Sequence, residues 1–147
     1  MTKTTGNPLA LEEQVCFALA VASRNVIALY RPLLEPMGLT HPQYLVMLAL
    51  WQHAPLSVKE LSRLLQLDPG TLSPLLKRLE SLDLVVRRRA DHDERVLAVT
   101  LTPAGQALRA EAERIPPAIV SRLGMPIEEL QDLHAMLTRV IDLTRDS

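Results

Sequence analysis

Apolar residues recur at three- and four-residue steps through most of the chain, a spacing that predicts a mainly helical protein. The first such pattern covers residues 8 to 34 and stops at the Pro-Met-Gly segment 36 to 38. Pro32 lies inside this pattern and is expected to bend or end the helix. A second pattern begins at Thr40 and ends near His53. The apolar positions of the first pattern are Leu11, Val15, Ala18, Leu19, Ala22, Val26, Leu29 and Leu33.

Residues 56 to 102 predict two short helices, a tight turn between them and two short strands. The first helix opens at Ser57, and Glu60 completes a capping box. The second helix has Asp68 as its expected N-cap and Pro69 at its first position, where the missing N–H costs nothing. The expected buried positions are Val58, Leu61, Leu64 and Leu65 in the first helix and Leu72, Leu75, Leu76, Leu79 and Leu82 in the second.

The two predicted strands cover residues 84 to 89 and 96 to 101, and a polar tip, residues 90 to 94, joins them. A helix-turn-helix followed by a hairpin of this kind is typical of a winged helix-turn-helix, in which the hairpin is the wing. The predicted fold class is therefore mainly α with a small β-hairpin wing.

The outward face of the second helix carries the side chains best suited to contact DNA. Small hydroxylated residues at its start allow close approach to a major groove, and the cations that follow reach bases or phosphates. The basic strand is expected at phosphates, and Arg95, oriented by Asp93, is expected in a minor groove. Amphipathic helix pairs are common in all-α proteins and basic strand ends are usually only solvated, but this combination, in this order, favours binding of double-stranded DNA. The predicted contacts are Thr71, Ser73, Lys77, Arg78, Arg88, Arg89, Asp93 and Arg95.

Overall charge and composition neither support nor exclude that interpretation. The formal net charge is −1, so the positions of the cations carry the argument and their total does not. The N-terminal stretch is charged where a secretory signal would be apolar, and no uninterrupted apolar run approaches the roughly 20 residues of a membrane span. A single cysteine excludes an intrachain disulfide framework. These features predict a cytoplasmic protein in a reducing compartment that does not enter the membrane.

The segments on either side of residues 40 to 102 are expected to be dimerisation helices. They cover residues 8 to 35 and 103 to 147, with Thr102 capping the first helix after the wing and a break or kink at residues 115 to 117. Their apolar stripes exceed what the small core can cover, which predicts a twofold homodimer on a pseudo-palindromic operator. The alternative is that these helices pack only within one chain.

Residues 93 to 105, DERVLAVTLTPAG, resemble the wing and the following helix start of the MarR family of bacterial regulators. With the flanking helices the resemblance extends across nearly the whole chain. The segments LEEQVCFAL and THPQYLVMLALW further resemble the organic hydroperoxide-resistance regulators, the OhrR branch of that family. The resemblance implies a dimeric regulator, normally a repressor, that releases operator DNA when an organic hydroperoxide oxidises one cysteine.

Cys16 is the residue that the resemblance singles out. Taken alone, a cysteine among apolar residues is usually an inert buried side chain, although a position near a helix N-terminus favours a thiolate modestly. The resemblance implies that the Cys16 thiolate becomes a sulfenic acid and that Tyr30 of a partner subunit hydrogen-bonds the reduced sulfur. Tyr30 cannot reach Cys16 along one helix, because fourteen residues span about 21 Å. His41 stands where the family has a tyrosine, and it either assists the thiolate or is a solvent-facing turn residue.

Other interpretations stay open or are disfavoured on the residues present. A cysteine-dependent peroxidase needs a resolving thiol, and with a single cysteine the oxidised sulfur requires an external low-molecular-weight thiol or is overoxidised. The four histidines show no metal-ligand spacing, and no cofactor is expected. The strongest rival is a MarR-type regulator that a small phenolic or aromatic ligand releases from DNA, with Cys16 merely structural.

Overall fold

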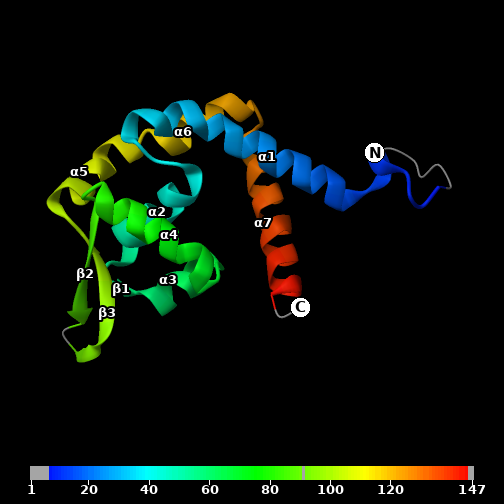
Figure 1. The fold of residues 1–147 in the computed structure, drawn as a ribbon. Coiled ribbons are helices and arrows are strands. Elements are labelled where there is room, and N and C mark those ends of the chain that lie inside the picture. The colour runs from blue at the N-terminus through cyan, green and yellow to red at the C-terminus, as the bar shows by residue number, and fades with distance from the viewer. Residues whose placement is uncertain (1–6, 91, 146–147) are drawn as a thin grey trace. The chain divides into compact units, whose positions relative to one another are not determined.

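A computed structural model describes residues 7 to 90 and 92 to 145, without the side chains of Asp93 and Glu94 (Figure 1). The chain divides between Glu113 and Arg114 into two compact units. The elements in chain order are η1 (Leu11–Glu13), α1 (Val15–Leu34), η2 (Glu35–Met37), α2 (His41–His53), β1 (Leu56–Ser57), α3 (Val58–Leu65), α4 (Pro69–Ser81), β2 (Val85–Ala90), β3 (Asp93–Leu101), α5 (Pro103–Ala112), α6 (Ile115–Leu123) and α7 (Ile127–Thr144).

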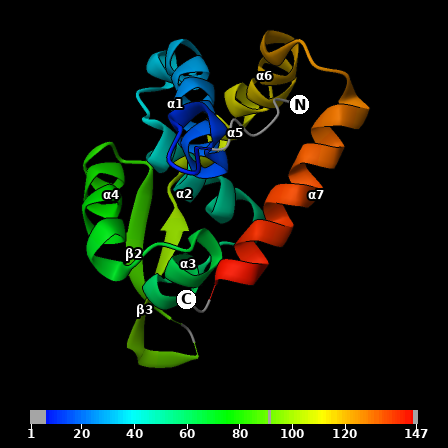
Figure 2. The ribbon, with the colours of Figure 1, turned by 90° about the vertical axis from the view of Figure 1, so that its right-hand side faces the viewer.

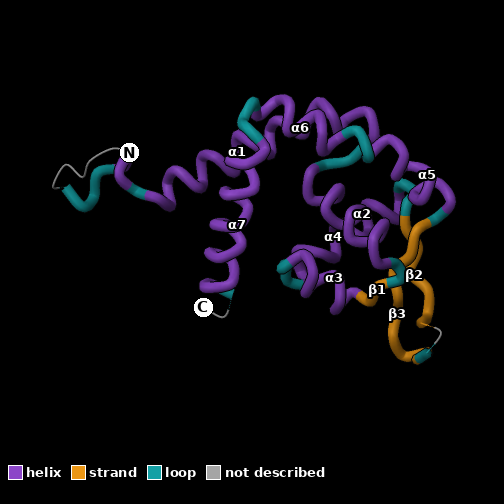
Figure 3. The backbone as a smooth tube through the Cα atoms, turned by 180° about the vertical axis from the view of Figure 1, so that it is seen from behind, coloured by secondary structure: helices purple, strands orange, loops and turns teal. Residues whose placement is uncertain are grey.

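The predicted fold class, mainly α with a small β-hairpin wing, is confirmed. Figure 3 shows helices over most of the chain and strands gathered in one sheet. That sheet is three-stranded and antiparallel with the order β1-β3-β2, so it contains one strand more than predicted. The added strand is β1, in which Leu56 lies opposite Val99. A two-residue strand is too short to show an alternating pattern, so only its partner in space reveals it.

The core of the first unit lies among α2, α3, α4 and the sheet (Figure 2). Leu61 of α3 and three leucines of α4 have no exposed surface. The predicted apolar faces were too wide, because Leu64 is 50% exposed and both Leu75 and Leu82 are only half-buried. An eight-residue helix such as α3 buries only the narrow stripe that faces its neighbours. The fully buried leucines of α4 are Leu72, Leu76 and Leu79.

The structure moves three predicted boundaries by a few residues. α1 begins at Val15, later than the predicted residue 8, and ends at Leu34 as predicted; Pro32 lies inside the helix and does not end it. The predicted break or kink at residues 115 to 117 is confirmed slightly earlier in the chain, because α5 ends at Ala112 and α6 begins at Ile115. The prolines of α6 occupy its first turn, where no backbone N–H is needed. β3 begins at Asp93, so the strand pair reaches further toward the wing tip than predicted. The tip residue Asp91 lies outside the described residues.

α1 exposes an unusually apolar surface within the first unit. Val15 is 80% exposed, Leu19 42% and Ile27 41%. The segment Val15–Met37 is also long and apolar enough to cross a membrane. No uninterrupted apolar run in the sequence had indicated such a segment. One such helix is weak evidence for a span, since a helix covered by a protein partner has the same composition. α7, in the second unit, likewise exposes Ile127, Leu133, Met136, Val140, Ile141 and Leu143.

Candidate DNA-binding surface and cysteine site

Local hydrogen bonds fix the helix-turn-helix. Ser57 and Glu60 form the predicted capping box, in which Ser57 Oγ accepts from the Glu60 N–H at 3.0 Å and Glu60 Oε1 accepts from the Ser57 N–H at 3.0 Å. Hydrogen bonds from Ser57 lower the pKa of Glu60. At the other end of α3, Gln66 adopts the left-handed conformation, with φ 55°, and the Ser62 hydroxyl donates to the Leu67 carbonyl. The turn between the two helices is therefore held from both sides.

Asp68 caps the recognition helix α4, as predicted. Its Oδ1 accepts from the Thr71 N–H at 2.9 Å, and its Oδ2 accepts from the Thr71 hydroxyl at 3.0 Å. These bonds, the backbone one first, lower the pKa of Asp68, so the carboxylate is ionised at neutral pH. The cap sets the direction of α4 and also uses the hydroxyl hydrogen of Thr71.

The exposed face of α4 brings most of the predicted contacts together. Thr71, Lys77 and Arg78 are exposed, whereas Ser73 is half-buried and less available than predicted. Pro74 is also exposed on this helix and was not among the predicted contacts. Its position as a proline inside a predicted helix was the feature of the sequence that could have identified Pro74 as a candidate contact. This face of α4 combines apolar, hydroxylated and cationic side chains.

Strand alternation places the predicted wing contacts on different faces of the sheet. Arg88 lies opposite Ala98, and Arg89 lies opposite Leu97, so the two arginines point to opposite faces. Both are exposed, as is Arg95. A hollow of about 200 Å³ beside β2 and β3 is lined by Pro55, Arg88, Arg89, Ala90, Ala98 and Thr100.

The predicted roles of the wing residues stay predictions. Strand alternation allows Arg88 and Arg89 to contact phosphates only from different sides of the wing. The side chain of Asp93, predicted to orient Arg95, lies outside the described residues.

An ion pair that sequence inspection missed joins the recognition helix to the wing. Arg87 Nε lies 3.0 Å from Glu80 Oε1, which connects β2 to the last turn of α4. The two side chains are 25% and 35% exposed, so water screens the pair only in part. No local pattern predicts a contact between a helix and the strand that follows it.

We expect Arg87→Gln to weaken the attachment of the wing to α4. A double-mutant cycle with Glu80→Gln should give a coupling of about 0.5–1 kcal/mol in the free energy of unfolding, because the pair is partly solvated. Urea denaturation of the four proteins measures it. The exposed pair Arg109–Glu113, whose closest atoms are 3.9 Å apart, is the control and should show about 0.3 kcal/mol or less. Equal couplings for both pairs would contradict the prediction.

Tyr30 and His41, two of the three predicted redox residues, are neighbours in the structure. Their ring centroids are 4.8 Å apart in an edge-on arrangement, and Tyr44 completes a cluster at 5.9 Å from Tyr30. Burial raises the pKa of Tyr30, which therefore remains a protonated hydrogen-bond donor at neutral pH. Burial lowers the pKa of His41, which is therefore neutral there. Tyr44 was not predicted to belong to this site.

Cys16 is separated from that cluster within one chain. It is exposed, in the first turn of α1, whereas Tyr30 belongs to the last turns of the same helix. The helical rise puts about 21 Å between them, as the sequence predicted. A cavity of about 350 Å³ lies at the Tyr30 end of α1, between α1 and α2. It is lined by Ile27, Arg31, Leu34, Glu35, Leu39, Thr40, His41 and Pro42.

The half-buried imidazole of His41 should make the free energy of unfolding depend on pH. Because the pKa of His41 in the folded chain lies below its ordinary value of 6.5, the unfolded chain binds a proton first as the pH falls. The free energy of unfolding should therefore decrease from about pH 7 to pH 5.5, and it should decrease less in His41→Gln. Asp68 and Glu60 do not contribute in this window, since their pKa values are lowered from 3.8 and 4.5. Parallel curves for the two proteins in chemical denaturation would refute this role.

A helix-turn-helix with an attached wing, bearing exposed cations on the recognition helix, defines a winged-helix DNA-binding protein. The family profile of the transcriptional regulators SarA/Rot matches residues 28–111. The organic hydroperoxide resistance transcriptional regulator of Bacillus subtilis (strain 168) is 40% identical over 134 residues, 91% of each chain. The chain therefore belongs to the SarA/Rot family of MarR-like transcriptional regulators. The predicted membership in the MarR family and its OhrR branch, and the prediction of a regulator instead of an enzyme, are confirmed.

Two solved structures of AbfR, a protein of Staphylococcus epidermidis, are similar to this chain. Reduced AbfR bound to DNA matches with a TM-score of 0.72 at 36% identity, covering 90% of this chain and 92% of that one. Overoxidised AbfR bound to DNA matches with a TM-score of 0.71 at 35% identity, covering 90% and 94%. In the described part of the present chain, no group of three or more histidine, cysteine or acidic residues is placed to hold a metal ion.

Proposed function

We propose that this protein is a cytoplasmic transcriptional regulator that binds double-stranded operator DNA and represses until an organic hydroperoxide oxidises Cys16. The observation that carries the DNA-binding part is the exposed face of α4, where Lys77 and Arg78 follow the small residue Thr71. A recognition helix of this composition suits a major groove of DNA. The arginines of the wing extend the DNA-binding surface toward the adjacent sugar-phosphate backbone. The similarity to DNA-bound AbfR supports this placement.

The dimer is part of the proposal. The exposed apolar side chains of α1 give each chain a surface that water solvates poorly. A second copy of the chain covers this surface with an identical apolar surface of its own. A twofold dimer presents two recognition helices to half-sites about 34–36 Å apart, which suits a pseudo-palindromic operator. It also allows Tyr30 and His41 of one chain to approach Cys16 of the other, which one chain alone does not achieve.

Oxidation proceeds at the sulfur of Cys16. The thiolate attacks one peroxide oxygen, the O–O bond breaks, and the alcohol leaves after taking a proton, so that Cys16 becomes a sulfenic acid. A protonated Tyr30 phenol is suited to hydrogen-bond the thiolate beforehand, and neutral His41 offers a second donor. A low-molecular-weight thiol then displaces water from the sulfenic acid and leaves a mixed disulfide. Such an adduct is bulky, and at a dimer contact it would force the two chains apart.

The mixed disulfide is the form that we expect to release DNA. In the relative AbfR the overoxidised protein was solved bound to DNA, so overoxidation in that protein is compatible with binding. A sulfinic or sulfonic acid on Cys16 adds only two or three oxygens, much less volume than a thiol adduct.

A DNA-binding titration tests the proposal. It uses the fragment upstream of the protein's own gene and compares reduced protein, protein treated with one equivalent of cumene hydroperoxide and cysteine, and Cys16→Ser treated alike. We expect treatment to lower the affinity of the wild type at least tenfold, a thiol reductant to restore it, and Cys16→Ser to stay bound. Mass spectrometry identifies the sulfur species in the released protein. Release of Cys16→Ser together with the wild type would contradict the redox mechanism.

A second candidate has its own observation. The cavity beside His41 has room for a small aromatic molecule, and Arg31 in its wall suits an acidic or phenolic group. In that case such a ligand releases DNA and Cys16 is structural. Release of both wild type and Cys16→Ser by salicylate, with no effect of peroxide on either, would favour this alternative.

A further inference from the structure

The first two turns of α4 present less hydrogen-bonding capacity than their sequence suggests. The Thr71 hydroxyl donates to Asp68 Oδ2 at 3.0 Å, and a threonine hydroxyl has only one hydrogen. Toward a base, Thr71 can therefore offer an acceptor and a methyl group, but no donor. Asp68 adds acceptors only, because its carboxylate is ionised.

Pro74 makes the same part of the helix apolar. It lies three residues after Thr71, on the same side of α4, and it is exposed. Its ring carries no N–H, so it can offer a base edge only apolar contact. Ser73, the other hydroxylated residue of this segment, is half-buried and points less toward solvent. The nearest side-chain donors on this face are Lys77 and Arg78, one turn further along.

We infer that Thr71 and Pro74 determine specificity for an A·T base pair in each half-site. In the major groove this pair offers the amino group of adenine, which donates to an acceptor, and the C5 methyl of thymine, which suits an apolar partner. A G·C pair at the same place can offer Thr71 the amino group of cytosine, but it carries no C5 methyl for the apolar contact, and its guanine O6 and N7 acceptors find no free hydroxyl hydrogen on Thr71. The inference rests on the proposed DNA binding and adds which residues select which base pair.

The test removes single methyl groups from the DNA. In duplexes of the operator fragment each thymine is replaced in turn by deoxyuridine, which lacks only the C5 methyl, and Kd is measured at fixed salt with reduced protein. We expect the affinity of the wild type to fall about twofold to fivefold at one symmetry-related pair of thymines, which corresponds to one buried methyl per half-site.

Two protein variants test whether Thr71 and Pro74 are the residues that contact the thymine methyl group. Thr71→Ser keeps the hydroxyl that bonds Asp68 and loses the methyl, while Pro74→Ser loses the ring and regains a backbone N–H in an exposed position. In each variant the deoxyuridine effect should shrink to about 1.5-fold or less, because its apolar partner is gone. Ser81→Ala is the control. Its hydroxyl donates to the Arg78 carbonyl at the far end of α4, so the full methyl effect should remain.

The outcomes separate the inference from the proposed function. Specific binding by the wild type without any methyl effect overturns the inference alone. An unchanged methyl effect in both Thr71→Ser and Pro74→Ser does the same. Failure of the wild type to bind any of the duplexes overturns the proposed function and the inference together.

Discussion

Gly105→Ala should destabilise the protein by about 3 kcal/mol and lower the melting temperature by about 10 °C. A Cβ built at Gly105 overlaps the carbonyl oxygen of Leu84. That oxygen accepts from the Thr102 N–H at 3.1 Å, so neither segment can yield without loss of a hydrogen bond. The Trp51 indole also donates to the Gly105 carbonyl at 2.9 Å and holds α5 from the other side. The start of α5 would have to lift from the end of the wing.

Thermal and urea unfolding at one fixed protein concentration measure this effect, since association contributes to apparent stability. Gly70→Ala is the matched control. Its Cβ would meet only Asp68 Oδ1, at 3.1 Å, which is the end of an exposed side chain that can shift by a few tenths of an ångström. We expect a change of about 1 kcal/mol or less there. Helix propensity and reduced backbone freedom both favour alanine over glycine, so similar losses at both glycines would contradict the assignment of the cost to the contact with Leu84.

Replacing Lys77 and Arg78 together by alanine should lower operator affinity about a hundredfold at about 0.15 M salt. Both side chains are exposed on α4, so their loss should leave the fold unchanged. Each cation that neutralises a phosphate contributes about 0.9 to the slope of log K against log salt, and a twofold dimer counts each substitution twice. A smaller slope would therefore assign the cations to phosphates. An unchanged slope with relaxed sequence preference would assign them to base edges.

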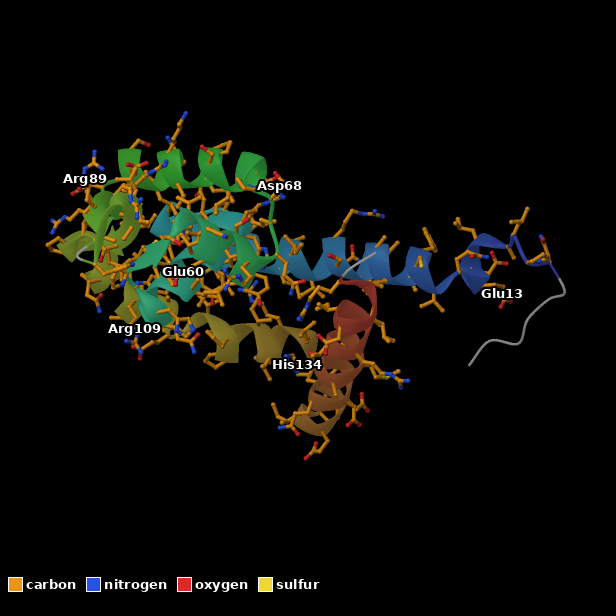
Figure 4. All side chains as sticks on the ribbon, turned by 90° about the horizontal axis from the view of Figure 1, so that it is seen from below. Glu13, Glu60, Asp68, Arg89, Arg109 and His134 are labelled. Atoms are coloured by element: carbon orange, nitrogen blue, oxygen red, sulfur yellow. The ribbon has the colours of Figure 1, made fainter. Side chains whose placement is uncertain are left out.

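The matched control for this pair is Arg109→Ala. Figure 4 shows Arg109 on the side of the first unit away from α4, whereas Asp68 marks the start of that helix. Arg109 is exposed and 3.9 Å from Glu113, so its removal should change neither stability nor operator affinity by more than about twofold. If the double substitution Lys77→Ala/Arg78→Ala left the operator affinity unchanged, α4 would not be the element that contacts DNA.

Sequence-based prediction succeeded for this chain where the controlling interactions are local. Ser57, Asp68 and Thr102 were predicted as helix caps, and each accepts the expected backbone hydrogen bond in the structure. It failed where the apolar period was continued too far, as for Leu64, or where a segment was expected to be helical from residue 8, since α1 begins only at Val15. Period and propensity describe one segment at a time, and tertiary packing decides how wide a buried stripe becomes.

The sequence by itself determined the order of the main helices and of the wing strands and the separation of Cys16 from Tyr30, because caps, periods and helical rise act along the chain. It indicated the family only through the resemblance of the segments around Cys16, His41 and the wing. Only the tertiary structure revealed the pairing of Arg87 with Glu80 and the cluster of Tyr30 with His41 and Tyr44. The third strand and the place of Gly105 against Leu84 belong to the same group. Each depends on two segments approaching within a few ångströms, and that distance follows from how the core packs and not from any pattern within either segment.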